Sequence, residues 1–398
     1  MVSLLAALQW TLLSLGIGSL LFAIISLADG VAFLRRITAS SGSRSSFQPK
    51  AVVLIPVRGL DPIFEKNLHA LLNQQYGEYR LVFIVDQGDE TEGHLREVEA
   101  KRPLSIVRSK PLRRCSGKIA ALLAGLEHVE EDDEIVVFAD GDIEPDLEWL
   151  AHLVAPLEDS GVAASTGYRW YFPTRGGLGP ALQSTWNSAA GNVMFSERWT
   201  YLWGGSYAIR REVLKELRIE ERWERCLSDD MIMTQALKEK GHRISFAPRA
   251  TVANYTDHSF SDVLRWTNRQ TCLALMYAPT MKRLTLPYVI YAASLLLAAA
   301  SGFLATLSMT FLLPTLLLLS PVYLGLWKNF LRRVAFRRAM PAFSRHFSRF
   351  RFWFYLASTL IPFLMIYNVR TALRMREFEW RGKIYKFTSP EDVTVLRP

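Results

Sequence analysis

The chain has 398 residues, which is enough for a catalytic core with additional elements. It is 50% hydrophobic, yet its formal charge is +9. This combination favours a membrane protein that presents Lys and Arg to an anionic surface, and it argues against a soluble nucleic-acid-binding protein. The three cysteines, Cys115, Cys226 and Cys272, have no CxxC spacing and therefore predict neither a disulfide scaffold nor a zinc site.

The amino-terminal segment, residues 2–28, contains no charged residue. It is long enough to cross a hydrocarbon core of about 30 Å. Arg35 and Arg36 follow it, whereas a cleavable signal peptide carries positive charge before its apolar stretch. We therefore predict a transmembrane anchor over residues 1–36, with its arginines in the cytoplasm, and a Ser-rich linker over residues 37–49.

The carboxy-terminal region, residues 284–369, holds further apolar segments. Residues 284–327 have no charge and predict two helices broken near 308–314, and residues 352–369 predict a marginal single span. The segment between them, 328–351, carries eight Lys and Arg and no acid, which predicts a cytoplasmic loop. The tail, 370–398, is also basic, so either the last segment does not cross the membrane or the preceding block crosses an odd number of times. We expect a cytoplasmic tail.

Residues 50–283 have the pattern of an α/β domain. Short apolar runs without polar alternation predict strands buried on both faces, and helical stretches separate them. The strands are expected at 51–55, 80–85 and 135–139, and the helices at 64–75, 92–101 and 118–128. This alternation predicts a parallel, doubly wound sheet that binds ligands beyond the carboxyl ends of its strands.

Three motifs at or beside these strand ends carry charge. Asp140-Gly141-Asp142 follows the third strand, and two carboxylates on a tight glycine turn can share Mg²⁺ or Mn²⁺. Asp86 ends the second strand and can accept a hydrogen bond from a nucleobase. Lys118 opens a helix and offers an ammonium to phosphate oxygens. Each motif alone is also compatible with a plain turn or helix cap.

Three further motifs follow downstream. Gly204 and Gly205 let backbone approach a ligand closely, or simply form a bend. Asp230 opens a predicted helix, where it can take a proton from an acceptor hydroxyl or cap the helix. Arg265 and Trp266 can bind phosphate and a sugar, or anchor the chain at a membrane interface.

In this order along the chain, the motifs resemble those of the family 2 glycosyltransferases with the GT-A fold. Within them the chain most resembles the ceramide glucosyltransferase branch and its bacterial, hopanoid-associated relatives. The resemblance is carried by IPVRGLDP at 55–62, RREVL at 210–214 and LSDDMIMTQALKEKGHRISFAP at 227–248. It covers about residues 50–285, together with Trp380-Arg381-Gly382 and Tyr385 near the end of the chain.

The resemblance implies a Rossmann-like, mostly parallel sheet flanked by helices, and it implies roles for single residues. Asp230 would be the general base, with Asp229 as its partner in the acidic pair. Asp142 and Asp140 would hold Mg²⁺ or Mn²⁺. The donor would be bound by Pro56, Arg58, Asp86, Lys118, Asp140, Arg265 and Trp266, and the acceptor by Trp203, Gly204, Gly205 and Ser206. Asp262 departs from the family's (Gln/Arg)-x-x-Arg-Trp motif, which argues against a processive polysaccharide synthase.

The function implied is inverting transfer of a hexose, glucose in that branch, from a UDP-sugar to the hydroxyl of a membrane lipid such as ceramide. We expect a multi-pass protein of a bacterial cytoplasmic membrane, with a cytoplasmic catalytic domain over residues 50–283 and no nucleic-acid or obligate protein partner. Amphipathic segments at 183–199 and 260–277 would lie on the membrane. Transfer to polyprenyl phosphate, processive synthesis, and a non-catalytic protein that binds lipid or nucleotide remain the alternatives.

Overall fold

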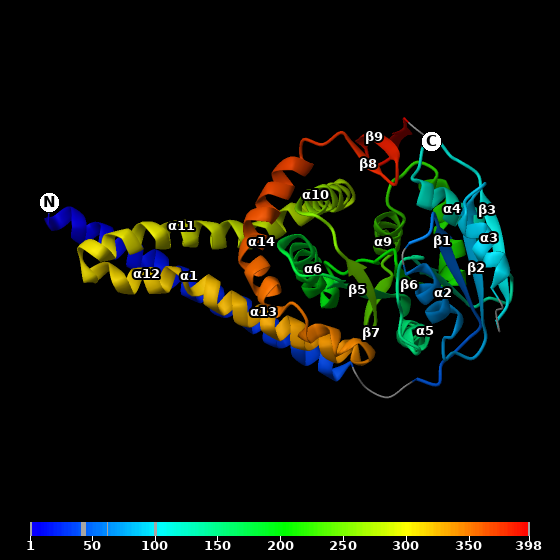
Figure 1. Cartoon of the computed structure of the whole chain (residues 1–398), viewed down its shortest axis with the longest axis horizontal. Helices are drawn as coiled ribbons and strands as arrows, with labels where there is room; N and C mark the ends of the chain where they lie inside the picture. Colours follow the sequence, from blue (N-terminus) through cyan, green and yellow to red (C-terminus); the bar gives the residue numbers. More distant parts are fainter. Residues whose placement is uncertain (1, 41–44, 62, 99–101, 397–398) are drawn as a thin grey trace.

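The structure, a computed structural model, describes residues 2–40, 45–61, 63–98 and 102–396. Its centre is a seven-stranded sheet in the order β3-β2-β1-β4-β6-β5-β7 (Figure 1). Only β6 is antiparallel to its neighbours, so the predicted mostly parallel α/β sheet is confirmed. The strands are β1 (Ala51–Val57), β2 (Tyr79–Asp86), β3 (Leu104–Ser109), β4 (Ile135–Ala139), β5 (Val162–Pro173), β6 (Ser206–Arg210) and β7 (Arg243–Thr256).

The three predicted strands are present, but β1 continues through Pro56 instead of ending before it. Proline lacks the N–H that a central strand normally donates. Pairing of β1 with β4 ends at Leu54, whereas pairing with β2 continues to Val57. Pro56 therefore lies where one neighbour of the strand has already ended.

Helices cover both faces of the sheet, and each face has its own buried core. Val53 and Ile55 of β1 pack with the helices on one side, and Val52 and Leu54 pack with those on the other. The helices are α2 (Phe64–Leu72), α3 (Thr91–Glu97), α4 (Gly117–Leu126), α5 (Trp149–Val154), α6 (Leu178–Ala190), α7 (Arg211–Leu217), α8 (Ile219–Trp223), α9 (Asp229–Glu239) and α10 (Phe260–Tyr277). The first three predicted helices are shorter than expected, and residues 99–101 of one of them lie outside the described residues.

Among the described residues, four helical segments are long and apolar enough to cross a membrane. They are α1 (Val2–Ala39), α11 (Leu286–Leu307), α12 (Leu312–Leu318) continuing into α13 (Ser320–Ala339), and α14 (Arg351–Ala372). The predicted break falls at Ser308, between α11 and the short 3₁₀ turn before α12. In Figure 1, α1, α11 and α12–α13 extend together away from the sheet, whereas α14 runs across their direction beside the domain.

The helix α14 has two different faces. One face packs on α6 and α10 through Ala357, Ile361 and Leu364, and the buried amide of Asn368 bonds to Trp186, Thr267 and Asn268. The other face exposes an apolar stripe with helical spacing, formed by Phe352, Leu356, Leu360, Phe363 and Tyr367. A helix with one packed face and one exposed apolar face suits the surface of a membrane.

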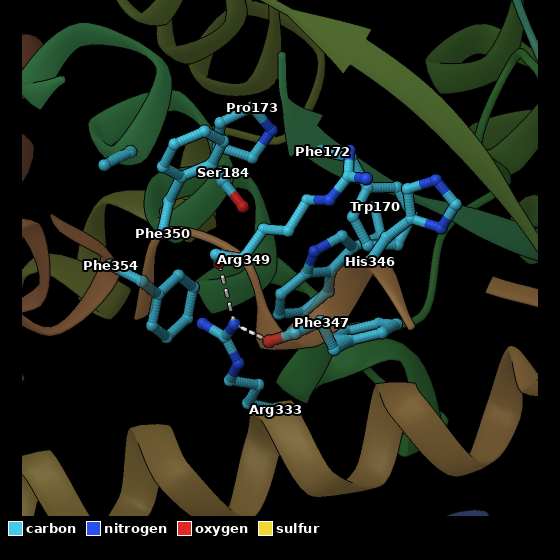
Figure 2. Close-up of a pocket in the computed structure, with 11 residues that line it drawn as sticks. Trp170, Phe172, Pro173, Ser184, Arg333, His346, Phe347, Arg349, Phe350 and Phe354 are labelled. Carbon is cyan, nitrogen blue, oxygen red and sulfur yellow. Dashed lines mark hydrogen bonds between the residues drawn. The ribbon is translucent and has the colours of Figure 1, made fainter. Parts of the chain in front are cut away.

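The basic segment 328–351 is not the free loop that we expected. Half of it continues α13 to Ala339, and Arg332 and Arg333 are buried. Figure 2 shows the Arg333 guanidinium donating to the carbonyl oxygens of Phe347 and Arg349 among aromatic rings of β5 and α14. Arg332 donates to the Asn192 side chain of the α/β domain at 3.1 Å. These two arginines therefore bind protein groups and are not available to lipid headgroups.

The carboxy-terminal tail also has structure that the sequence patterns did not predict. It forms a three-stranded antiparallel sheet of β8 (Glu377–Trp380), β9 (Lys383–Ser389) and β10 (Asp392–Val395). Phe378, Tyr385 and Phe387 of this sheet are buried in the same core as α4. The tail therefore lies on the same side of the apolar helices as the α/β domain.

Candidate active site

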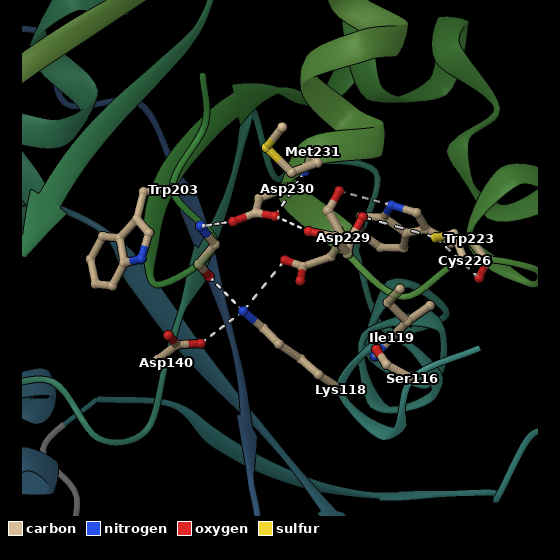
Figure 3. Close-up of polar contacts among 12 residues, drawn as sticks. Ser116, Lys118, Ile119, Asp140, Trp203, Trp223, Cys226, Asp229, Asp230 and Met231 are labelled. Carbon is tan, nitrogen blue, oxygen red and sulfur yellow. Dashed lines mark hydrogen bonds and ion pairs between the residues drawn. The ribbon is translucent and has the colours of Figure 1, made fainter. Parts of the chain in front are cut away.

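The Lys118 ammonium lies at the centre of the charged residues at the strand ends (Figure 3). The ammonium lies 2.8 Å from the Asp140 carboxylate, 3.4 Å from that of Asp229 and 2.9 Å from the Gly204 carbonyl oxygen. Burial disfavours the charged amine, but the carboxylates of Asp140, Asp229 and Asp230 outweigh it and raise the pKa of Lys118. Lys118 is therefore a fixed cation at the carboxyl end of β4.

Two aspartates begin α9, and their surroundings differ. Asp230 accepts the Gly204 N–H at 2.8 Å on one oxygen, and the Ser228 hydroxyl at 2.5 Å and the Met231 N–H at 2.7 Å on the other. Asp229 is buried, and its Oδ2 has no hydrogen-bond partner in the described chain. Burial, and then the charges of Asp230 and Asp140, raise the pKa of Asp229 to about 7 despite Lys118.

The two glycines lie between these groups, where they leave no space for a side chain. A Cβ on Gly204 would stand 2.8 Å from the Lys118 ammonium and 3.0 Å from the Asp230 carboxylate. A Cβ on Gly205 would stand 2.4 Å from the Trp203 ring and 2.6 Å from the Asp140 carboxylate. The glycines thus allow the aspartates of β4 and α9 to approach the same ammonium.

Trp203 and Ser206, which flank the glycines, are buried. The Ser206 hydroxyl accepts from the Trp149 indole at 2.8 Å and donates to the Ala250 carbonyl at 3.3 Å. Both of its hydrogen bonds go to the protein interior, so the structure does not bring Ser206 into the charged cluster. The Trp203 ring packs against the Arg169 guanidinium, 5.0 Å from the ring centre.

Asp142 has the features of a cation ligand. Its Oδ1 atom is buried without a hydrogen-bond partner in the described chain, and the Asn254 amide fixes its backbone carbonyl at 2.8 Å. Burial and the neighbouring charge of Asp140 raise the pKa of Asp142. An orphaned buried carboxylate oxygen beside a second carboxylate fits a hard divalent ion.

Another acidic group, Glu130, Asp132 and Asp133, also brings its oxygens close together. This group precedes β4, at the opposite end of the strand from Asp140. Lys50 pairs with Asp132 and Arg80 pairs with Asp133, both at 2.5 Å. Two protein cations therefore already offset most of its charge.

Asp86 lies at the end of β2, and its side chain is 34% exposed. The Ser109 hydroxyl donates to its Oδ1 at 2.7 Å, while Arg58 and Lys383 stand 3.7 and 3.9 Å from Oδ2. The Pro56 carbonyl oxygen lies 3.6 Å from the Cβ position of Gly141, so the end of β1 lies beside the turn between Asp140 and Asp142.

The profile of the family described as "Glycosyltransferase like family 2" matches residues 49–272, which contain nearly all of this cluster. The chain belongs to this family. The chain is 26% identical over 214 residues to "Probable glycosyltransferase YdaM" of Bacillus subtilis (strain 168), a match that covers 51% of this chain. The chain spans about half the length of that curated relative, with 50% of it covered.

The chain is similar to two solved structures, among others. A mannosyltransferase from Pyrobaculum calidifontis, in complex with GDP-Man and Mn²⁺, has a TM-score of 0.44 at 16% identity, over 90% of this chain and 99% of that one. Glucosyl-3-phosphoglycerate synthase from Mycobacterium tuberculosis has a TM-score of 0.40 at 17% identity, over 62% of this chain and 84% of that one.

The structure separates the two residues of the predicted Arg265-Trp266 pair. Arg265 is exposed and pairs with Asp262 in the first turn of α10, so the structure does not bring it to the cluster. Asp262 serves in the capping box of that helix, which explains why an acid stands there. Trp266 is buried against Trp186, and the Arg169 guanidinium lies 5.6 Å from its ring centre.

Two partly buried arginines of the chain were not among the predicted site residues. Arg169 is a charged residue inside the apolar run of β5, and it acts electrostatically on both Asp140 and Asp142. Arg269 follows Arg265 by one helical turn, and its guanidinium lies 4.9 Å from the Trp380 ring centre. A charge within a buried strand was the one sequence signal that could have identified Arg169.

Proposed function

We propose that the protein transfers a hexose from a UDP-sugar to the hydroxyl of a membrane lipid, with inversion at the anomeric carbon. The observation that carries this proposal is the convergence of Asp140, Asp142, Lys118, Asp229 and Asp230 at one end of the sheet. A single displacement needs one base and one stabilised leaving group. The cluster offers both within one group of side chains.

Asp230 is the base in this proposal. A lipid hydroxyl has a high pKa, so its proton must leave as the oxygen attacks. The Gly204 N–H and the Ser228 hydroxyl orient the Asp230 carboxylate. Its Oδ1 already accepts two hydrogen bonds, whereas Oδ2 accepts only the Gly204 N–H and retains a lone pair for the proton. Asp229 is buried behind it and, beside Lys118, sets the position of the ammonium.

Lys118 stabilises the leaving diphosphate by its charge. Because Asp140 and the Gly204 carbonyl hold the ammonium before any ligand arrives, little reorganisation accompanies the reaction. Asp142 and Asp140 would hold Mg²⁺ or Mn²⁺, and such an ion supplies Lewis-acid neutralisation of phosphate charge.

The membrane arrangement follows from the directions of the apolar helices. We propose that α1, α11 and α12–α13 cross the bilayer and that α14 lies along its surface. The 22 residues of α11 rise about 33 Å, close to the thickness of a hydrocarbon core. Asp29 and Lys328 form an ion pair at 2.9 Å where the apolar parts of α1 and α13 end. Three crossings return the chain to the side of the catalytic domain, which is the side of the packed tail.

A lipid acceptor fits this arrangement. The exposed apolar stripe of α14 lies opposite the face that packs on α6 and α10, and these two helices contribute Trp186 and Trp266 beside Arg169. A lipid held at the stripe would keep its tails in the bilayer while its hydroxyl faces the catalytic domain. The preference for ceramide and glucose rests on the sequence resemblance alone.

The test is incubation of detergent-purified protein with a panel of UDP-sugars, Mg²⁺ or Mn²⁺, and the acceptors ceramide, diacylglycerol and polyprenyl phosphate, with products read by mass spectrometry. We expect one hexose on a lipid hydroxyl. A glycosylated polyprenyl phosphate or a polymer would replace the lipid-hydroxyl proposal with the corresponding alternative. Binding of UDP without any product would favour the non-catalytic alternative.

A further inference from the structure

The carboxy-terminal sheet is part of the catalytic domain. Besides its buried side chains, the Val395 N–H donates to the Arg113 carbonyl at 2.9 Å, beside the segment that leads into α4. The Tyr385 hydroxyl accepts the N–H of Gly117, the first residue of α4, at 3.3 Å. The sheet therefore touches the helix end that carries Lys118.

A tight turn of this sheet reaches the donor side of the cluster. Trp380 pairs with Lys383, and the two residues between them, Arg381 and Gly382, have φ angles of +51° and +75°. Such angles form the two-residue hairpin turn that matches strand twist, with glycine at its second position. Arg381 at the tip donates to the Arg58 carbonyl at 3.2 Å, in the segment after β1.

Lys383, the first residue after this turn, is buried although it is charged. Its side chain is 10% exposed, and its ammonium lies 3.9 Å from the Asp86 carboxylate, its one ion pair in the described chain. The same ammonium lies 3.4 Å from the Cβ position of Gly117. A buried ammonium costs free energy unless anionic groups surround it, and this one has a single distant partner.

We propose that Lys383 is a donor-site residue whose ammonium binds the phosphate of the nucleoside diphosphate that lies next to the nucleoside. This proposal rests on the proposed function, in which Asp86 receives the base and Lys118 faces the leaving diphosphate. Lys383 lies between Asp86 and the α4 end that carries Lys118, where the phosphate next to the nucleoside would lie if Asp86 receives the base and Lys118 the terminal phosphate. Lys118 is already bound to Asp140 and Asp229. Arg58 also lies near Asp86 but is 41% exposed, so Lys383 is the buried cation on the nucleoside side.

The experiment measures binding of uridine, UMP and UDP to the full-length protein by calorimetry. Lys383→Gln is compared with Lys386→Gln, which changes an exposed lysine on the same strand. We expect Lys383→Gln to weaken the binding of UMP and UDP about tenfold to a hundredfold, as for loss of a charge-assisted hydrogen bond. The binding of uridine should be unchanged. Lys386→Gln should bind all three as the native protein does.

Equal weakening of uridine and UDP would overturn the proposal, because Lys383 would then only position Asp86. Unchanged UMP and UDP binding would overturn it as well. If Lys383→Gln fails to fold, Lys383→Arg takes its place. A folded Lys383→Arg variant that binds UMP and UDP no more tightly than uridine would again contradict the proposal. If the native protein binds no uridine compound, the UDP donor class fails, and the same series with guanosine, GMP and GDP applies the same criterion to Lys383.

Discussion

Asp229 and Asp230 are sequence neighbours that the fold places in different chemical environments. Asp230 is partly exposed and held by three hydrogen bonds, whereas Asp229 is buried beside Lys118. Adjacent residues at the start of a helix point in different directions, so one can face the reaction and the other the interior. Their replacement should therefore have separable effects.

Asp230→Asn should remove the basic carboxylate, while the amide oxygen can still accept the Gly204 N–H. We expect transfer to fall about 10²- to 10⁴-fold, with the Kd for UDP unchanged. Single-turnover kinetics and calorimetry measure the two quantities. Asp257→Asn, at an exposed position, is the matched control. Retained turnover in Asp230→Asn would remove Asp230 from the base role.

Gly205→Ala tests the close approach at the centre of the cluster. Its Cβ would meet the Trp203 ring and the Asp140 carboxylate, so the variant must displace one of them. We expect a loss of about 1–3 kcal/mol in stability and a clear fall in turnover. Gly93→Ala, whose Cβ meets no atom within 4 Å, is the control and should match the native protein in both measurements.

The raised pKa of Asp229 predicts a pH-dependent stability in the absence of donor and metal. The folded state favours the protonated carboxyl of Asp229. The contribution of this carboxyl to the free energy of unfolding is therefore complete below pH about 4, and it is lost as the pH rises towards 7. The stability of the native protein relative to Asp229→Asn should therefore fall between pH 5 and 7.5, by at most about 4 kcal/mol. Thermal unfolding of both proteins across this range measures the difference, and a constant difference would contradict the assignment.

At the scale of elements, the composition of α14 indicates a membrane span, whereas its position in the structure indicates a helix packed on the domain. Its length and hydropathy suit a membrane span, but it packs on α6 and α10 and lies across the other apolar helices (Figure 1). The buried Asn368 amide, with three protein partners, is a strong reason for this placement because a polar group in lipid would lose those partners.

Accessibility of the ends of α14 tests its placement. Arg351→Cys and Arg370→Cys put thiols at exposed positions near the two ends of the helix, and the three native cysteines are buried. If α14 lies on the surface, an impermeant thiol reagent should label both variants from the same side of sealed vesicles. Met309→Cys, at the exposed turn after α11, should react only from the opposite side. Labelling of positions 351 and 370 from opposite sides would show a fourth crossing.

At the scale of the whole molecule, the apolar helices and the catalytic domain share one buried core. Phe33 of α1 and Phe336 of α13 lie 5.7 Å apart between ring centres, and Phe336 also contacts Trp170 of β5 at 5.0 Å. The helices are therefore packed into the domain at their ends and are not joined to it by a linker alone. This packing fixes the distance of the cluster from the proposed membrane surface.

Phe336→Ala should destabilise the whole protein and not only the helical part. Phe336 is fully buried, so we expect a loss of about 3–5 kcal/mol and a single lowered unfolding transition. Phe330→Ala, on the same helix at an exposed position, should cost much less. Thermal unfolding in detergent, followed through UDP binding, measures the effect. A native-like UDP-binding transition in Phe336→Ala would mean that domain and helices unfold separately.

Sequence periodicity and turn residues predicted a large part of this fold. The strands containing Val53, Phe83 and Val137, the helix break at Ser308 and the long apolar helix near the amino terminus were all visible as local patterns. Runs of buried residues and charge-free stretches are properties of neighbouring residues. Lys118, Asp140 and Asp230 could be named as candidates for the same reason, since each lies beside a strand or helix end.

The sequence by itself thus determined the α/β sheet, the apolar helices and most of the residues that meet at the strand ends. Only the tertiary structure separated Arg265 from the cluster, buried Arg332 and Arg333 in what looked like a loop, and laid α14 across the other helices. It also brought Lys383 of the tail close to Asp86, although the two residues are 297 positions apart in the sequence (383 minus 86). These outcomes depend on which side chains from distant segments neutralise or cover one another, and no local pattern carries that information.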